Sequence, residues 1–449
     1  MQGMPRSGEI VVVCALALLA IGVVMTSSAG MSVGEGGAVT FGTILGSNEA
    51  LYAVLSVLAM LAIRALPMRR LLTGRAKLDS GAGRSPAAHD RDASRASSNL
   101  PPRGAFLGDL APILVPVSIA LMLLVYVPAL SHEVNGATRW VKLPGGISFQ
   151  PSEFAKWTLP VVLAWWGWRR VGVMRSFRFG LLPPLAVLTL VSAIIVMEDL
   201  GTGVLVFAVG AVVLLAAGAR LWHMLALVGP VFVAGAVVGV LAEPYRVRRI
   251  VGFLNPYDDP SGTNYHMIQS LAAVAGGEGA GRGLGFGVQK FGYLPEDRTD
   301  FLFAIVCEEL GLVGAAVVVA LYAGLLLSGA AIARRERHPF LKLVVLGLLL
   351  TLGFQALMNL MVVTGLAPTK GIALPLLSAG GTGWLLTASS LGLLASLDRS
   401  HTPAAARERG RPWSNTSKSD RLRRFSSASR SPATSGAARR ARPARPSPA

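Results

Sequence analysis

Ten apolar segments, each near the ~20 residues that a helix needs to cross a bilayer, dominate this 449-residue chain. Apolar residues make up 52% of the chain and charged residues only 15%, whereas roughly a quarter of a water-soluble protein is charged. We therefore predict an all-α polytopic membrane protein with a large structured extracytoplasmic loop before its eighth helix. The expected transmembrane helices are residues 9–28, 49–66, 110–130, 153–168, 179–197, 200–218, 222–242, 301–330, 340–362 and 372–397.

The first apolar segment is expected to stay in the protein. It is longer than the apolar region of a signal peptide, and no convincing cleavage site follows it. Residues 1–8 would then be a cytoplasmic N-terminus, and residues 9–66 the first two transmembrane helices. Cys14 and Cys307 both fall in apolar segments, so neither a disulfide framework nor a metal cluster is expected from them.

The formal charge of +18 is concentrated in two segments. Residues 67–105 contain 8 Lys/Arg and 3 Asp/Glu, and the tail 398–449 contains 13 Lys/Arg and 3 Asp/Glu. Both segments are rich in Ser, Ala, Pro and Arg, which predicts disorder. Basic segments beside spans are typical of the cytoplasmic side and of contacts with anionic lipid. No nucleic-acid partner is therefore expected.

The Lys/Arg bias also orients the chain. Segments 67–105, 169–178 and 331–342 and the basic tail fall on one side of a ten-span chain, whereas residues 29–48 contain no Lys or Arg. This pattern predicts that both termini are cytoplasmic. Residues 106–397 would form the membrane core, with its long loops on the opposite side.

The external loop 243–300 is far longer than an ordinary connection, so it is either functional or disordered. Its apolar content favours packed structure, either a cap of re-entrant helices or one wall of a site. Its glycine run matches neither a P-loop nor a dinucleotide fingerprint and is typical of a flexible turn. Arg246, Lys290 and Arg298 in this loop are candidates for binding an anion, either a lipid headgroup or a lipid-linked pyrophosphate.

Carboxylates cluster where this loop meets the eighth span. Glu296 and Asp300 precede the span, and Glu308 and Glu309 lie within it. Charge inside or beside a span is costly and is usually kept for function. The alternative role for Asp300 is a helix cap. Because Glu308 and Glu309 point in different directions, at least one of them is expected to be a buried structural partner.

Further charged residues lie near other predicted spans. Arg139 and Lys142, before the fourth span, are candidates for contacting an anion. Glu153 and Lys156 share a helix face, which favours a buried ion pair over a lysine that faces a cavity. Asp199 lies in the short turn between the fifth and sixth spans.

The segment 364–384, which contains Lys370 and Ser378, interrupts the tenth span with Pro and Gly. Broken helices at membrane depth usually line a cavity, because their free backbone groups need protein or water partners. We therefore expect Lys370 and Ser378 to lie near a substrate site.

Four separated motifs occur in one order: GATRWVKLPGGISFQPSEFAK, EDLGTG, IQSLAAVAGGEGAGRGLGFGVQKFGYLPEDRTDFLFAIVCEELGLVGA and PTKGIALPLLSAGGTGW. Together they resemble the SEDS family (shape, elongation, division and sporulation) over nearly everything from Gly136 to Leu397. QKFGYLPE and APTKG are more similar to its FtsW branch than to its RodA branch. The chain departs from the family pattern at Ala379, where Tyr is common, and at Asp297 and Arg298, where Ala-His or Ser-His is frequent.

The resemblance implies a peptidoglycan glycosyltransferase of the bacterial inner membrane that polymerises lipid II into glycan strands during cell division. The growing strand would pass from one undecaprenyl pyrophosphate carrier to the 4-hydroxyl of another lipid II. The family's essential aspartate in its Thr-Asp-Phe motif corresponds to Asp300, the expected general base. The expected substrate-binding residues are Arg139, Lys142, Lys156, Glu153, Asp199, Arg246, Lys290, Glu296, Arg298, Glu308, Lys370 and Ser378.

The resemblance also implies partners. A class B penicillin-binding protein should cross-link the polymer as its transpeptidase, and divisome proteins should recruit the pair, while the basic tail would contact anionic lipids. A divalent cation, Mg²⁺ or Mn²⁺, would assist departure of the pyrophosphate, although no ligand set is readable, and no nucleotide is expected.

Three alternatives stay open at this point. A lipid II flippase would need a polar route across the membrane, which Asp199, Lys156 and Glu308 could line. A scaffold would only recruit a transpeptidase, and charge-neutral changes at Asp300 would then leave growth intact. A polymerase of the RodA type would act in elongation instead of division.

Overall fold

A computed structural model of the chain describes residues 6–399, apart from 31–41, 43–45, 74–107, 135–136, 143–147, 242 and 263. These residues belong to one compact unit that spans residues 1–400. Nearly all of the basic segments 67–105 and 398–449 lie outside the described residues.

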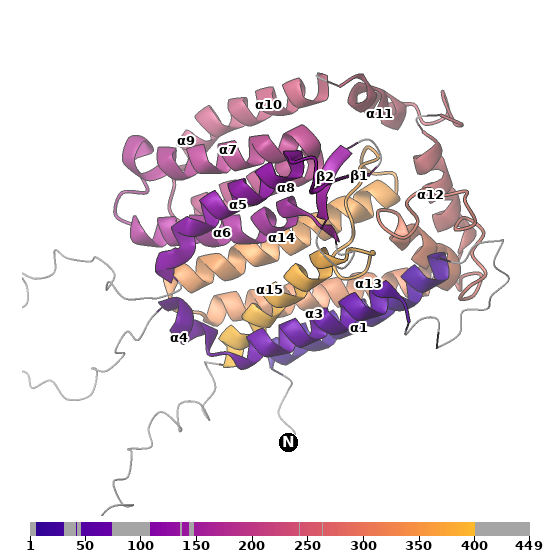
Figure 1. Ribbon diagram of the computed structural model, residues 1–449, viewed down its shortest axis with the longest axis horizontal. Coiled ribbons are helices and arrows are strands. Elements are labelled where there is room, and N and C mark those ends of the chain that lie inside the picture. Colours follow the sequence, from indigo (N-terminus) through magenta and orange to yellow (C-terminus); the bar gives the residue numbers. More distant parts are fainter. Residues whose placement is uncertain are drawn as a thin grey trace, which may run out of the picture. The chain divides into compact units, whose positions relative to one another are not determined.

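Helices make up most of this unit (Figure 1). In chain order they are α1 (Ser7–Ala29), α3 (Asn48–Ala65), α4 (Met68–Thr73), η2 (Gly108–Ile113), α5 (Leu114–Leu123), η3 (Leu124–Tyr126), α6 (Pro151–Arg169), η4 (Phe177–Leu181), α7 (Leu182–Glu198), α8 (Leu200–Ala216), α9 (Leu221–His223), η5 (Met224–Val228), α10 (Gly229–Leu241), α11 (Pro244–Leu254), α12 (Tyr265–Gly276), α13 (Leu302–Arg335), α14 (Pro339–Val363) and α15 (Thr382–Arg399).

Several helices have the length and composition of membrane spans. Among the described residues, 6 stretches are long and apolar enough to cross a membrane: 7–29, 48–65, 108–126, 177–198, 302–335 and 339–363. Helix α8 is apolar but shorter. The chain is thus a mostly helical, multi-pass membrane protein, while the predicted number of ten spans stays a prediction.

The predicted tenth span begins later than expected. Helix α15 starts at Thr382 and not at residue 372, because residues 364–381 contain no helix. Leu376 and Gly381 in this segment have φ values of 64° and 46°. Both values lie in the left-handed region, which a right-handed helix does not contain.

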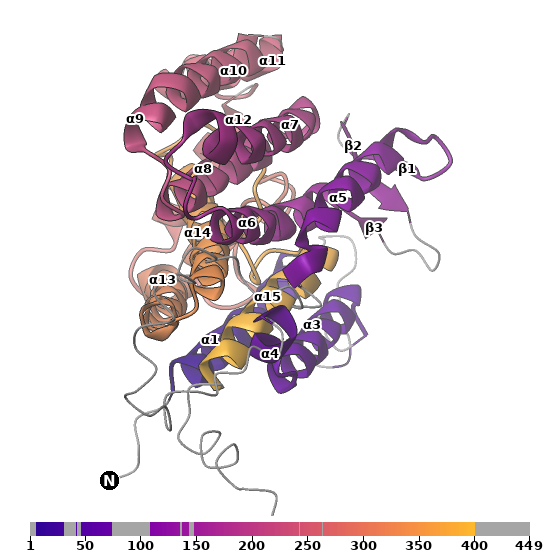
Figure 2. The ribbon, with the colours of Figure 1, turned by 90° about the vertical axis from the view of Figure 1, so that its left-hand side faces the viewer.

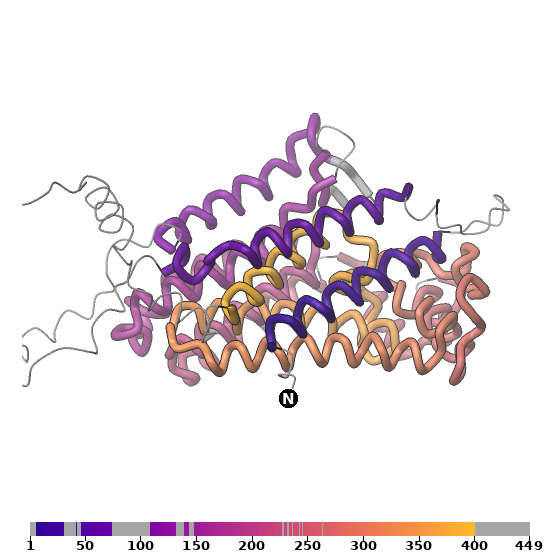
Figure 3. Tube along the Cα trace, turned by 90° about the horizontal axis from the view of Figure 1, so that it is seen from below, coloured from indigo at the N-terminus to yellow at the C-terminus, as the bar shows by residue number. Residues whose placement is uncertain are grey.

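Helices from distant parts of the chain build the core. Helix α15 packs chiefly on α3 and α1, and α1 packs on α13. Figure 3 shows the yellow α15 beside the indigo α1 and α3. Helix α14 packs on α6, α8 and α13, and Figure 2 shows it next to α6 and α8. The segment between α14 and α15 is therefore surrounded by helices from both halves of the chain.

A small sheet corrects the all-α prediction. Strands β1 (Ser131–Val134), β2 (Ala137–Lys142) and β3 (Ser148–Phe149) pair antiparallel in the order β1-β2-β3. Val134 pairs with Ala137 on either side of Asn135-Gly136 in the sequence. Asn-Gly between two strands is the strongest local signal for a two-residue hairpin. The sheet brings Arg139 on β2 to the same end of the unit as the loop before α13.

The predicted long loop before α13 contains packed structure. It holds α11, α12 and a turn-rich stretch at residues 277–301. Helix α13 is interrupted at Gly311, whose φ of 65° favours glycine. The N–H groups of Arg282 and Gly283 donate to the carbonyls of Glu308 and Glu309, before this interruption. The turn-rich stretch thus folds back onto the first turns of α13.

Candidate active site

A polar cavity of about 390 Å³ lies where several separate parts of the chain meet. Strands β2 and β3, the start of α6, the α7–α8 junction, the turns before α13 and the non-helical segment before α15 all contribute to its wall. Its charged lining residues are Arg139, Glu153, Asp199, Glu296 and Asp300. A cavity of this size with converging polar groups is typical of a ligand site.

Asp300 is fixed in the cavity wall through its backbone. Asn359 on α14 donates to the carbonyls of Asp300 and Ile372, at 2.7 Å each. A Cβ at Gly371 would lie 2.6 Å from Asp300 Oδ2, so glycine leaves room for the carboxylate. Among the described residues, no hydrogen bond reaches the carboxylate oxygens of Asp300. Helix α13 has Phe301 as its N-cap with no side-chain cap bond, so the alternative of Asp300 as a helix cap is wrong.

The surroundings of Asp300 favour its protonated form. Burial, followed by the carboxylates of Glu296 and Asp199, raises the pKa of Asp300 to about 7, while Arg139 and Arg249 oppose the shift. A carboxyl group with a pKa near neutral can both accept and release a proton at physiological pH. The geometry and the pKa together make Asp300 the candidate acid–base residue.

The Asp199 side chain caps the start of α8 and lies near Lys370. Its Oδ1 accepts from the N–H groups of Gly201 (2.9 Å) and Thr202 (3.2 Å), and its Oδ2 accepts from Thr202 Oγ1 (2.7 Å). Lys370 Nζ lies 3.6 Å from Oδ1. Burial raises the pKa of Asp199, but Lys370, Thr202 and Arg139 outweigh burial, so the pKa lies below its ordinary value. Asp199 is therefore ionised at neutral pH.

Lys370 lies next to the cavity in a cationic environment. Burial lowers the pKa of Lys370 to about 8, and Arg246 and Arg139 lower it as well, while Asp199 raises it. Arg246 donates to the Gly239 carbonyl at 2.7 Å. Lys370 therefore contacts the cavity lining at Asp199. The positive charge of Arg246 lowers the pKa of Lys370.

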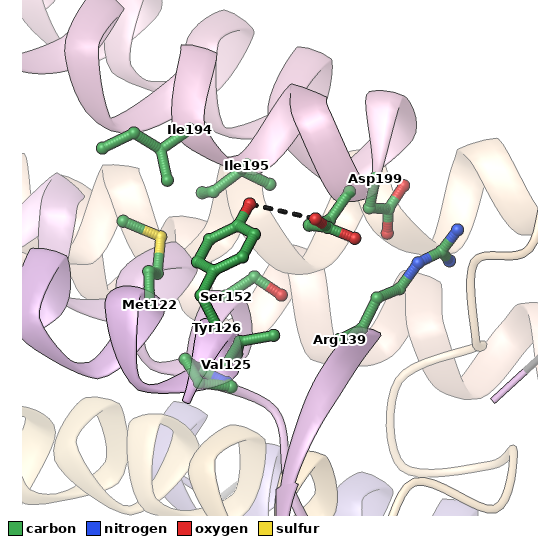
Figure 4. Close-up of a pocket in the computed structure, with 10 residues that line it drawn as sticks. Met122, Val125, Tyr126, Arg139, Ser152, Ile194, Ile195 and Asp199 are labelled. Carbon is green, nitrogen blue, oxygen red and sulfur yellow. Dashed lines mark hydrogen bonds between the residues drawn. The ribbon is translucent and has the colours of Figure 1, made fainter. Parts of the chain in front are cut away.

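Arg139 connects the cavity to a second, smaller pocket of about 30 Å³. Asp199 also lines both the cavity and the small pocket. Apolar side chains of α5, η3 and α7 form much of the rest of the small pocket. Figure 4 shows the Arg139 guanidinium facing the Asp199 carboxylate. The Tyr126 hydroxyl donates to Glu198 Oε1 at 2.9 Å. Arg139 Nε is buried without a hydrogen-bond partner among the described residues. The guanidinium therefore keeps a donor for an anionic ligand.

Glu153 and Lys156 form the ion pair that their spacing predicts. Lys156 Nζ lies 2.6 Å from Glu153 Oε1 and donates to Gln355 Oε1 at 2.6 Å. Gln355 Nε2 donates to the Ala373 carbonyl at 2.8 Å. Glu153 and Gln355 line the cavity, whereas Lys156 is buried and is not among the lining residues. Lys156 thus supports the wall of the cavity.

Side chains of α13, of α15 and of the segment itself hold the non-helical segment before α15. Ser378 Oγ accepts from the Leu374 N–H at 3.0 Å, and Trp384 Nε1 donates to the Ser378 carbonyl at 2.5 Å. The Tyr322 hydroxyl on α13 donates to the Pro375 carbonyl. These contacts satisfy backbone groups that a helix would otherwise satisfy. Ser378 lines the cavity, as its position in the broken span predicts.

Glu309 binds the glycine-rich stretch and does not line the cavity. Its carboxylate accepts from Ser28 Oγ at 2.8 and 2.9 Å, and from the N–H groups of Gly285 and Gly287 at 3.0 and 3.3 Å. Lys290 Nζ lies 2.8 Å from Glu309 Oε1, and both side chains are fully buried. A buried carboxylate with this many donors is a satisfied structural group.

Glu308 has a similar structural role. Its carboxylate accepts from the N–H groups of Val288 at 2.8 Å and Gln289 at 3.2 Å. Arg282 Nε lies 3.7 Å from Glu308 Oε1. We refer to Ser28, Lys290, Glu308 and Glu309 as the glutamate cluster. The cluster ties the glycine-rich stretch to α13 and α1, because Gly285 and Gly287 donate to Glu309 and the next two residues donate to Glu308.

The structure separates the predicted substrate-binding residues into groups. The cavity lining contains Arg139, Glu153, Asp199, Glu296, Asp300 and Ser378. Lys156 and Lys370 form ion pairs with lining residues, and Arg246 lowers the pKa of Lys370. Lys142 is exposed on β2, Lys290 and Glu308 belong to the glutamate cluster, and Arg298 lies against Gly30.

The sequence analysis missed Thr202, Gln355 and Asn359. Thr202 lies in the EDLGTG motif, three residues after Asp199. Its N–H donates to Asp199, the N-cap of α8. Gln355 and Asn359 are polar residues four apart in an apolar span, and they therefore share one helix face. Polar residues paired in this way inside a span are the signal that could have identified them.

The described residues contain no group of three or more His, Cys, Asp and Glu side chains that could hold a metal ion. The carboxylates of the cavity therefore do not form a metal site made by protein ligands alone.

Comparison with known sequences places the chain among bacterial proteins. The sequence model of the FtsW/RodA/SpoVE family, described as cell cycle protein, matches residues 97–403. A probable peptidoglycan glycosyltransferase FtsW of Nitrosococcus halophilus is 40% identical over 303 residues, covering 66% of this chain and 77% of the relative. The protein of the same description from Aliivibrio salmonicida is 40% identical over 285 residues, covering 62% of this chain and 70% of the relative.

Solved structures have the same fold. A chain from a study of polymerization and crosslinking by a peptidoglycan synthase complex aligns with a TM-score of 0.62 at 26% identity, covering 87% of this chain and 96% of that one. The rod shape determining protein RodA of Thermus thermophilus aligns with a TM-score of 0.54 at 23% identity and the same coverage. The family match extends over more than half of the sequence, and the chain therefore belongs to the FtsW/RodA/SpoVE family.

Proposed function

We propose that this chain is a peptidoglycan glycosyltransferase that polymerises lipid II, with Asp300 as its general base. The curated relatives named as probable peptidoglycan glycosyltransferases support the activity. The observation that carries the assignment of the base is the position of Asp300 in a polar cavity, without hydrogen bonds to its carboxylate from the described residues and with a pKa raised to about 7.

Asp300 would act on the acceptor hydroxyl. The 4-hydroxyl oxygen of one lipid II attacks the anomeric carbon of the growing strand, and the bond from that carbon to undecaprenyl pyrophosphate breaks. Asp300 takes the hydroxyl proton as the new C–O bond forms. A positioned base of this kind contributes about 10²–10⁴-fold to the rate. A single displacement inverts the anomeric carbon and needs no carboxylate nucleophile.

The departing pyrophosphate needs positive charge. Arg139 lines the cavity with a donor that lacks a partner among the described residues, and a guanidinium binds phosphate oxygens with defined geometry. Lys370 lies beside the same cavity, 3.6 Å from Asp199. We assign both residues to the pyrophosphate, while the roles predicted for Lys142, Lys290, Arg298 and Glu308 in substrate binding receive no support from their positions.

The same proposal includes the topology expected from the sequence. The chain would cross the bacterial inner membrane ten times, with the core at 106–397, the loop before α13 outside and both termini in the cytoplasm. The Lys/Arg bias supports this orientation. The structure of a peptidoglycan synthase complex supports a class B penicillin-binding protein as partner. Divisome proteins, anionic lipids at the tail, and a Mg²⁺ or Mn²⁺ requirement stay predictions, the last testable with EDTA.

The decisive experiment is polymerisation of lipid II by the purified protein with its cognate transpeptidase. We expect Asp300→Asn to lose at least about 100-fold in rate while it still folds and binds lipid II. Asp297→Asn is the matched control, because Asp297 is close in sequence but is not among the residues that line the cavity. Its rate should stay within a few-fold of wild type.

Other outcomes would favour other functions. Full polymerisation by Asp300→Asn would exclude Asp300 as the base and move the search to Glu296. Transfer of labelled lipid II across liposomes by a wild-type protein that forms no polymer would favour the flippase. Rescue of elongation, and not of division, in depleted cells would assign the RodA-type role.

A further inference from the structure

Much of the apolar side of α11 faces outward, at Ile250, Val251 and Leu254, while Val247 and Val251 also border a hollow that Asp258 and Asp259 line. Val247, Ile250, Val251 and Leu254 recur at the spacing of one helix face. Val251 is 53% exposed and Leu254 is 70% exposed. A surface helix of a water-soluble protein would turn such a face toward the core. In α11 the pattern is reversed, which indicates an apolar environment outside the unit.

The opposite side of α11 packs on the protein. Arg249 Nη1 donates to the Thr369 carbonyl at 3.2 Å, next to Lys370 at the edge of the cavity. Gly252 is buried, and the side chain of Asn264 packs against it. The polar face of the helix is thus directed inward, toward the segment that also carries Gly371 beside Asp300.

The helix before α11, α10, also exposes apolar side chains. Val233, Val238 and Leu241 on α10 are exposed, and α10 belongs to the apolar region predicted to span the membrane. Figure 1 shows α11 directly after α10, at the end of the unit where α12 also lies. Arg248 is exposed at the border of the apolar face. An apolar face flanked by arginine is typical of a helix in the membrane interface.

We propose that α11 lies in the interface of the bilayer leaflet next to the cavity. Its apolar face would enter the boundary between headgroups and acyl chains by about 5–10 Å, with Arg248 at the lipid phosphates. Its inward face holds the Thr369 carbonyl through Arg249. The helix therefore fixes the depth of the cavity edge relative to the lipid, where the pyrophosphate of a lipid-linked substrate would lie.

Site-directed spin labelling of the protein alone in nanodiscs of phosphatidylethanolamine and phosphatidylglycerol tests this. The native Cys14 and Cys307 are buried, so labels are directed to Val251→Cys, Leu254→Cys and the exposed control Asp258→Cys. We expect the ratio of accessibility to oxygen over a water-soluble nickel chelate to be severalfold higher at Val251 and Leu254 than at Asp258.

Equal ratios at the three positions would overturn the proposal. Nickel accessibility at Val251 and Leu254 that disappears only when the cognate transpeptidase is added would also overturn it, and would assign this face to a protein partner. Neither result depends on polymerase activity, so the proposal about α11 and the proposed function can fail separately.

Discussion

Asp300 and Glu309 are close in sequence, and the structure treats their carboxylates in opposite ways. Glu309 receives hydrogen bonds from Ser28, Gly285 and Gly287, and an ion pair from Lys290. Asp300 receives none from the described residues, and its neighbours raise its pKa to about 7. A buried carboxylate whose donors are supplied by the fold stabilises the fold, whereas one that faces a cavity without donors is available for chemistry.

The strongest test of this comparison is Glu309→Gln. The amide would leave the Lys290 ammonium buried without its counter-ion, and we expect the free energy of unfolding to fall by about 3–5 kcal/mol. Thermal unfolding of the purified variant in nanodiscs measures this loss. The double variant Glu309→Gln/Lys290→Met removes both charges and should recover much of the stability. A Glu309→Gln protein as stable as wild type but without polymerase activity would give Glu309 a chemical role and break the comparison.

Arg139→Ala tests whether a charged residue that lines the cavity serves the reaction and not the stability of the fold. Loss of a cation at the developing pyrophosphate charge should lower the polymerisation rate by about 10²-fold, with little change in thermal unfolding. Lys142→Ala is the control, because Lys142 is exposed on the same strand, and its rate should remain near wild type. Equal effects of the two substitutions would mean that general positive charge, and not the position of Arg139, matters.

The pH dependence of polymerisation should report on Asp300. A base must be deprotonated, so the rate should fall as pH decreases through about 7, the raised pKa of Asp300. Glu296→Gln removes a carboxylate that raises this pKa, so the midpoint should move to lower pH, by roughly one unit or less. The exposed Glu278→Gln serves as control. A midpoint that moves to higher pH, or not at all, would show that Glu296 does not raise the pKa of Asp300.

The smallest expected effect is on stability. The pKa of Asp300 is raised from 3.8 to about 7 in the folded protein, so the folded state binds the proton more tightly than the unfolded state. Ionising Asp300 therefore removes stability as pH rises from about 4 to 7. Asp300→Asn should raise the melting temperature by a few degrees at pH 8 and leave it unchanged at pH 4. An equal change at both pH values would show that ionisation of Asp300 is not its cause.

The sequence predicts the helices well because hydropathy is a local property. The expected spans coincide with helices from α1 to α14, and the spacing of Glu153 and Lys156 correctly predicts their ion pair. The β1–β2 pair was not predicted, although Asn-Gly at 135–136 of the sequence signals a hairpin, because its strands are too short to show a clear alternation of apolar and polar residues. The interruption of the tenth span by Pro and Gly in 364–384 is confirmed, whereas the exact start of α15 at Thr382 depends on left-handed residues such as Leu376 and was not predicted.

The candidate site could be predicted only in part. Arg139, Asp199 and Asp300 are identified by charge near predicted spans, and the cavity contains all of them. Glu308 carries the same local signal and binds backbone N–H groups of the glycine-rich stretch instead. Only tertiary structure distinguishes these cases, because the donors of Glu308 come from another segment. The same holds for Asn359, which reaches Asp300 only when α14 packs beside it.

The non-helical segment before α15 has a consequence for biosynthesis. Its backbone is held by Tyr322 on α13, by Asn359 on α14 and by Trp384 on α15. The ribosome delivers Trp384 after every other residue named in the cavity, so this contact can form only after α15 has begun to be synthesised. A chain that ends before Trp384 therefore lacks one of the three contacts that hold this wall of the cavity.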